Sequence, residues 1–132
     1  MDRLFLDANV LFSAAYRPDA GLVKFWKLKN AVLCSSRYAL NEARINLTEN
    51  LQRRRLATLA RRVHLFDAAP RLLPSSISLP EKDVPILLAA MEVRATHLIT
   101  GYLRHFGPYL GKKLEGILVL SPADYLNKHQ GR

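Results

Sequence analysis

The chain has 132 residues, 49% hydrophobic and 23% charged, a balance typical of one globular domain with an ordinary core and not of a disordered segment. Its single cysteine, Cys34, excludes an intramolecular disulfide, and no apolar run is long enough for a membrane span or a signal peptide, so we expect a cytoplasmic protein. The formal net charge of +9 favours polyanionic partners such as nucleic acid, although a basic surface also suits an acidic protein partner or simple solubility.

Short β-rich runs alternate with helical patterns along the whole chain. We expect strands at residues 4–6, 31–33, 64–66, 97–99 and 117–120. We expect helices at residues 10–15, 20–29, 36–51, 55–63 and 84–95, and a last helix that Ser121 caps and Pro122 begins. Segment 68–80, rich in proline and serine, is expected to be a loop. This alternation predicts a parallel sheet covered on both faces.

Two polar segments follow predicted strands directly. Asp7 ends the first strand, and the turn Thr100-Gly101-Tyr102 ends the fourth. Ligands of open parallel sheets bind outside the carboxyl ends of the strands, at the point where the strand order reverses. We therefore expect both segments to face one crevice.

Three carboxylates are candidates for that crevice, although each also has a structural explanation. Asp7 would cap the helix after the first strand, a role that Asn9 would serve equally. Glu42 would be a solvated helical glutamate, paired with a nearby arginine. Asp83, just before Val84 and Pro85, would be an N-cap. Taken one at a time, Glu42 and Asp83 are better explained structurally.

In combination, the segments around these acids resemble the motifs of PIN-domain proteins. The four matching segments are 6–14 (LDANVLFSA), 42–47 (EARINL), 82–90 (KDVPILLAA) and 97–106 (HLITGYLRHF). They occur in the family's order and at its spacings over essentially the whole chain. The resemblance is closest to stand-alone prokaryotic PIN ribonucleases, including VapC-type toxins.

This resemblance implies a single PIN-like domain over residues 1–132, a three-layer α/β/α sandwich with a central parallel sheet. It implies a metal-dependent endoribonuclease that cuts single-stranded RNA, acts as the toxin of a toxin–antitoxin pair, binds a cognate antitoxin and forms a homodimer. Asp7, Glu42 and Asp83 would be its catalytic residues and would hold Mg²⁺ or Mn²⁺, with Asn9 and Thr100 as supporting hydrogen-bonding groups. Because clustered carboxylates repel one another, at least one should have a raised pKa without metal.

Position 102 departs from the family pattern, which places an aspartate after Thr-Gly. Tyr102 supplies no ionised oxygen near neutral pH, since the reference pKa of tyrosine is about 10. Mg²⁺ keeps several waters, so three carboxylates suffice for one ion, but a second ion or tight binding of the first is put in doubt. Three explanations stay open: a naturally degenerate homologue, an enzyme that works with three acids, or an inactivating change selected because the active toxin harms its host.

A run of arginines is the second candidate for binding nucleic acid. Such a run is most often a solvated helical face, but here it is predicted close to the helix that carries Glu42. We therefore expect it to follow an RNA backbone, or to meet an acidic antitoxin segment. The arginines are Arg44, Arg53, Arg54, Arg55, Arg61 and Arg62.

Two other functions compete with the nuclease. The first is a catalytically inactive PIN homologue that binds RNA or a protein through its basic face. The second is a doubly wound receiver-type domain, which also uses acids to hold Mg²⁺. A receiver domain needs adjacent acids after the first strand and a lysine near the end, and neither feature is convincing in this sequence.

Overall fold

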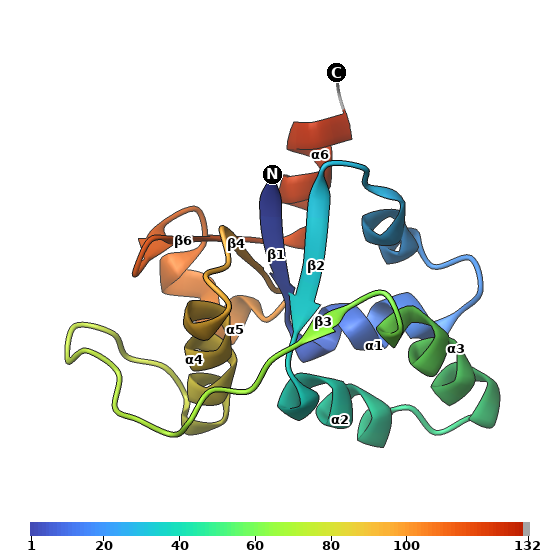
Figure 1. Cartoon of the computed structure of the whole chain (residues 1–132), viewed down its shortest axis with the longest axis horizontal. Helices are drawn as coiled ribbons and strands as arrows, with labels where there is room; N and C mark the ends of the chain where they lie inside the picture. The colour runs from blue at the N-terminus through green and yellow to red at the C-terminus, as the bar shows by residue number, and fades with distance from the viewer. Residues whose placement is uncertain (131–132) are drawn as a thin grey trace.

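A six-stranded sheet forms the centre of the computed structural model, which describes residues 1–130, except for the side chains of 103, 129 and 130 (Figure 1). The strand order is β3-β2-β1-β4-β6-β5, and every neighbouring pair is parallel except β5 with β6. The strands are β1 (Asp2–Leu6), β2 (Ala31–Ser35), β3 (His64–Leu65), β4 (His97–Ile99), β5 (Lys113–Leu114) and β6 (Ile117–Leu120).

Helices cover both faces of this sheet, so the three-layer α/β/α architecture is confirmed. In Figure 1, α1, α2 and α3 lie to the right of the central strands, and α4 and α5 lie to the left. The α-helices are α1 (Ala8–Tyr16), α2 (Arg37–Asn46), α3 (Asn50–Ala60), α4 (Val84–Glu92), α5 (Leu103–Phe106) and α6 (Pro122–Gln130). The 3₁₀ helices are η1 (Gly21–Lys27), η2 (Glu81–Asp83) and η3 (Gly107–Tyr109).

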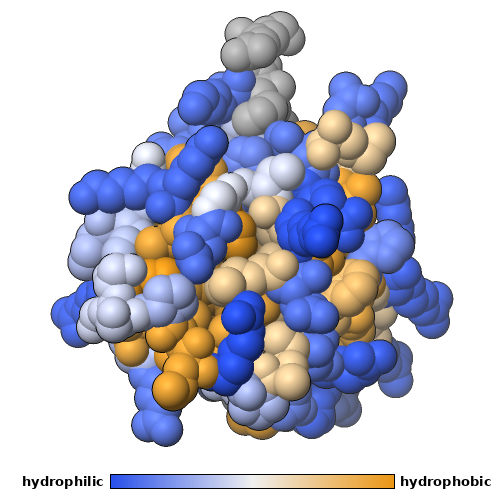
Figure 2. Space-filling model, turned by 60° about the vertical axis from the view of Figure 1, so that its left-hand side comes forward, coloured by the Kyte–Doolittle hydropathy of each residue, from blue (hydrophilic) through white to orange (hydrophobic). Residues whose placement is uncertain are grey.

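The core explains why the central strands read as continuous apolar runs. Leu4, Phe5 and Leu6 of β1 are all fully buried, as are Leu98 and Ile99 of β4, because both faces of the sheet are covered by helices. On the side of α4 and the segment between β3 and η2, hydrophobic residues still reach the surface in patches bordered by hydrophilic ones (Figure 2). None of the helices in residues 1–130 is both long and apolar enough to span a membrane.

Several details differ from the sequence prediction, among them the following three. The helix expected at 20–29 is the 3₁₀ helix η1. The break between the two middle helices comes earlier in the chain than expected: α2 ends at Asn46 and α3 begins at Asn50. The main-chain N–H of Glu49 donates to Gln52 Oε1 (3.2 Å) and so caps the beginning of α3. The edge strand β5 was missed; it is two residues long and pairs antiparallel with β6 through a turn in which Gly116 has φ 84°.

The strand order reverses between β1 and β4. From β1 the chain moves outward to β2 and β3, and it then returns to place β4 on the other side of β1. The segments after β1 and β4, which carry Asp7 and Thr100, therefore lie at the same edge of the sheet, as predicted.

Candidate active site

Asp7 lies at the centre of this edge and is held on both carboxylate oxygens. It is the N-cap of α1 and is 1% exposed. Its Oδ1 accepts a hydrogen bond from the N–H of Ala8 (2.7 Å), and its Oδ2 accepts one from Thr100 Oγ1 (2.8 Å). Asp7 therefore both caps α1 and lies in the crevice between the segments that follow β1 and β4.

Asn9 and the turn after β4 fix the two loops to each other. Asn9 Oδ1 accepts a hydrogen bond from the N–H of Gly101 (3.2 Å), and Thr100 Oγ1 accepts one from the N–H of Tyr102 (3.1 Å). A Cβ added at Gly101 would come within 3.2 Å of Asn9 Nδ2, so glycine suits this close approach. Asn9 and Thr100 thus support the loop that positions Asp7.

Asp83 lies at the junction of η2 and α4 and is 3% exposed. The capping role considered for it is wrong for the side chain, which makes no cap hydrogen bond. The second position of α4 is Pro85, which has no N–H to donate, and the backbone of Asp83 is itself helical. Instead, Asp83 Oδ2 lies 3.0 Å from Nδ1 of His105.

The contact between Asp83 and His105 is close but is not a well-formed hydrogen bond. Both atoms are buried, and neither has a partner with acceptable hydrogen-bond geometry. The two side chains are 4% and 21% exposed, respectively. In the sequence, His105 stands three residues after Tyr102 and therefore close to the expected crevice, but no spacing of His and Cys residues indicates a zinc site there.

Glu42 lies on α2, half-buried, and its charge acts on Asp7. The expected pairing with an arginine is not found among residues 1–130; Arg44 donates to Asn41 Oδ1 instead (2.9 Å). Among residues 1–130, no three His, Cys, Asp or Glu side chains lie close enough together to enclose a metal ion.

The charges of two other acids act on Asp7. Burial, with a smaller contribution from the negative charges of Asp83 and Glu42, outweighs the two hydrogen bonds that lower the pKa of Asp7 and raises it to about 6. Burial also raises the pKa of Asp83, opposed by His105 and Lys82. The expected raised pKa is present, but burial contributes more to it than repulsion between the acids.

Tyr102 stands where a fourth acid was expected. Its ring lies 4.8 Å from the ring of His105, and Lys82 Nζ lies 5.9 Å from its centroid. Burial and the charges of the nearby acids raise the pKa of Tyr102, so its hydroxyl stays neutral at physiological pH. A second tyrosine that the sequence analysis missed, Tyr38 of α2, donates to the carbonyl of Lys82 (2.8 Å) and joins α2 to η2.

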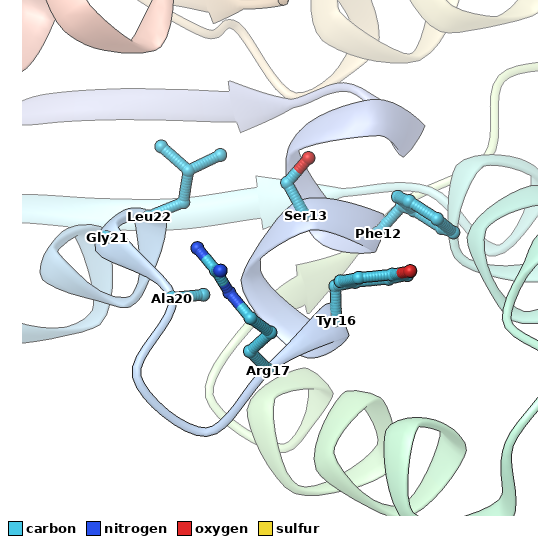
Figure 3. Close-up of a pocket in the computed structure, with 7 residues that line it drawn as sticks. All are labelled: Phe12, Ser13, Tyr16, Arg17, Ala20, Gly21 and Leu22. Atoms are coloured by element: carbon cyan, nitrogen blue, oxygen red, sulfur yellow. The ribbon is translucent and has the colours of Figure 1, made fainter.

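Two adjoining hollows lie on the exposed side of α1. The one beside Tyr102 has a volume of about 430 Å³ and lies over α1 and α2. Phe12 lines both this hollow and a second one of about 570 Å³, which Tyr16 and Arg17 also line (Figure 3). The rings of Phe12 and Tyr16 are 5.4 Å apart. A surface with aromatic rings therefore leads away from the acidic crevice.

Two of the six candidate arginines hold helices together. Arg53 Nε donates to the carbonyl of Leu47 (2.8 Å), and Arg55 donates to the carbonyls of Ala15 (2.9 Å) and Tyr16 (3.0 Å) at the end of α1. The side chains of Arg54, Arg61 and Arg62 are exposed. In Figure 1, α3 and α4, the helix that follows Asp83, lie on opposite sides of the central strands.

Comparison with solved structures identifies the architecture. A chain of VapBC2 from Rickettsia felis, bound to a DNA fragment from their promoter, superimposes with a TM-score of 0.66 at 15% identity, covering 90% of this chain and 98% of that one. The chain has a PIN-type fold. A chain of VapBC-1 from nontypeable Haemophilus influenzae gives a TM-score of 0.58 at 15% identity, covering 92% and 98%. No protein-family model and no curated sequence matches the chain.

Proposed function

We propose that this PIN-fold protein is a metal-dependent endoribonuclease that cuts single-stranded RNA and acts as the toxin of a toxin–antitoxin pair. The observation that carries the proposal is the environment of Asp7. Its carboxyl group is buried at the point where the strand order reverses, and the charges of both Glu42 and Asp83 act on it. Buried acids brought together in a crevice are characteristic of catalytic and metal sites.

The donor atoms fit Mg²⁺ or Mn²⁺. Both ions prefer oxygen ligands and retain several waters, so Asp7 and Asp83, with Glu42 nearby, suffice without a closed cage. The buried Asp83 Oδ2 has a 3.0 Å contact with His105 but no well-formed hydrogen bond, so it remains an oxygen that a cation can use as a ligand. When bound, the metal would activate water and neutralise charge on the scissile phosphate.

The chain's own residues orient this site and receive the substrate. Thr100 and Ala8 fix the Asp7 carboxylate, and Asn9 ties the neighbouring turn in place. The hollow beside Tyr102 gives room for a nucleotide next to the acids, and Phe12 offers a ring on which a base can stack. Exposed Arg54, Arg61 and Arg62 remain available for phosphates farther along the strand.

The partner that we propose is an antitoxin. Its support is the likeness to chains of two VapBC structures and the formal charge of +9, which suits an acidic segment as well as RNA. We also propose a homodimer, as the resemblance to PIN proteins implies. Size-exclusion chromatography with light scattering, with and without the product of a neighbouring short reading frame, tests both assemblies.

A second function is favoured by two observations. Tyr102 occupies the fourth acidic position, and no three candidate ligands within residues 1–130 lie close together. An inactive PIN homologue that binds RNA or protein through the same surface is compatible with this arrangement.

RNA cleavage with Mn²⁺ separates the two functions. We would assay the unchanged chain, Asp7→Asn and Tyr102→Asp on one single-stranded RNA. Cleavage by the unchanged chain that disappears in Asp7→Asn supports the nuclease. Cleavage only after Tyr102→Asp means that the site is disabled at one position, whereas cleavage by neither supports the binding module.

A further inference from the structure

The close contact between Asp83 and His105 requires a proton or a cation between its two atoms. Oδ2 and Nδ1 are 3.0 Å apart and buried, yet they do not form a hydrogen bond of acceptable geometry. A carboxylate oxygen and an unprotonated imidazole nitrogen both present lone pairs, so the contact is favourable only with a proton or a cation between them.

The spacing suits a shared cation. Octahedral ligands at about 2.1 Å from a small divalent ion lie about 3.0 Å from each other when they occupy adjacent positions. The distance between Asp83 Oδ2 and His105 Nδ1 has this value. The separation of these two buried atoms is therefore the one expected for neighbouring ligands of one ion.

His105 lies beside Tyr102, the residue at the expected fourth acidic position. His105 follows Tyr102 on the short helix α5, and the two rings are 4.8 Å apart. The imidazole nitrogen therefore lies beside the position from which the expected fourth carboxylate is missing.

We propose that His105 is a metal ligand that takes the place of the absent fourth acid. This inference rests on the proposed metal-dependent function. Replacing an oxygen ligand by nitrogen changes the preference of the site, because imidazole binds first-row transition metals better than it binds Mg²⁺. The site would accordingly select Mn²⁺ over Mg²⁺.

Pulsed electron paramagnetic resonance of bound Mn²⁺ detects a nitrogen ligand directly. We would add less than one equivalent of Mn²⁺ to the unchanged chain grown with ¹⁴N- or ¹⁵N-histidine. The expected result is a nitrogen coupling that changes with the isotope. Because this measurement uses no substitution, it tests the inference even if a variant does not fold.

The matched variants are His105→Phe, which keeps a ring beside Tyr102, and His64→Phe, at an exposed histidine on β3. His105→Phe should abolish the coupling and weaken Mn²⁺ binding by about 10- to 100-fold, while Mg²⁺ binding changes much less. His64→Phe should retain both the coupling and the affinity. Circular dichroism checks that each variant is folded.

The outcomes separate this inference from the proposed function. Mn²⁺ binding that requires Asp7 but shows no histidine coupling overturns the role of His105 and leaves the nuclease proposal standing; a His105–Asp83 ion pair is then the explanation of the contact. An absence of Mn²⁺ binding to the unchanged chain overturns both proposals. Unchanged Mn²⁺ affinity in folded His105→Phe also overturns the role of His105.

Discussion

The two buried aspartates of the crevice are held in opposite ways. Asp7 receives a hydrogen bond on each carboxylate oxygen, one from its own helix and one from the turn after β4. Asp83 is almost equally buried, yet its Oδ2 lies 3.0 Å from Nδ1 of His105 without good hydrogen-bond geometry. The fold therefore holds the carboxylate of Asp7 with two hydrogen bonds, whereas Asp83 has a close contact with His105 and no well-formed hydrogen bond on Oδ2.

Removing either carboxylate tests this difference most strongly. In an active enzyme, Asp7→Asn and Asp83→Asn should each lower Mn²⁺-dependent RNA cleavage by about a thousand-fold, since the metal supplies several kcal/mol of charge stabilisation. Cleavage rates under single-turnover conditions measure the effect. Asp19→Asn, at an exposed aspartate, is the control and should cleave normally. Full activity in both site variants would mean that the acids are structural.

The stability of the protein should respond to Asp7 with a defined sign. The pKa of Asp7 rises from 3.8 to about 6 on folding, so its protonated form favours the folded state below about pH 4, and this contribution is lost as the pH rises through 6. Without metal, Asp7→Asn should therefore raise the free energy of unfolding at pH 7.5 by up to about 3 kcal/mol and change it little near pH 3.5. Urea unfolding at both pH values measures this. Equal effects at the two pH values would contradict the raised pKa.

The tyrosine at the fourth position gives a smaller expected effect. Tyr102→Asp should increase Mg²⁺-dependent cleavage by about tenfold or more, because it returns an oxygen ligand to the crevice. Tyr102→Phe removes the hydroxyl but keeps the ring, and it should leave the rate within about twofold. Equal gains in both variants would show that the hydroxyl, and not the missing carboxylate, limits the rate.

The arginines of α3 should divide into two kinds. Arg55→Met removes donors to two carbonyls at the end of α1 and should cost about 1–2 kcal/mol of stability. Arg54→Met, at the exposed neighbour, should leave stability nearly unchanged but reduce the salt dependence of RNA binding. Chemical unfolding and RNA titrations at several salt concentrations measure the two effects. Loss of RNA binding without loss of stability in Arg55→Met would contradict this division.

The sequence was sufficient for the fold because local signals agree with the tertiary structure. The apolar runs became β1, β4 and β6, and Ser121 caps α6, accepting a hydrogen bond from the N–H of Asp124 (3.1 Å). The edge strand β5 was missed because two residues carry no periodicity. Because Asp7 and Thr100 each follow a predicted parallel strand, the strand assignments then predicted that they would face one crevice.

Side-chain direction was harder to predict than position. Asp83 is at the N-cap, but Pro85 removes one of the two N–H donors that a capping side chain uses, and the backbone of Asp83 is helical. The arginine run on α3 reads as one charged surface, whereas Arg53 and Arg55 bend back to main-chain carbonyls. The partner of Asp83 comes from a helix of four residues, and no sequence pattern predicted that contact.

Both outer strands of the sheet, β3 and β5, are only two residues long. Each margin therefore presents very few unpaired main-chain groups to a strand from another molecule. A partner or a second copy has little opportunity to extend the sheet by β-augmentation and must recognise the helices and their side chains instead. The same short margins protect the molecule against aggregation through its sheet edges.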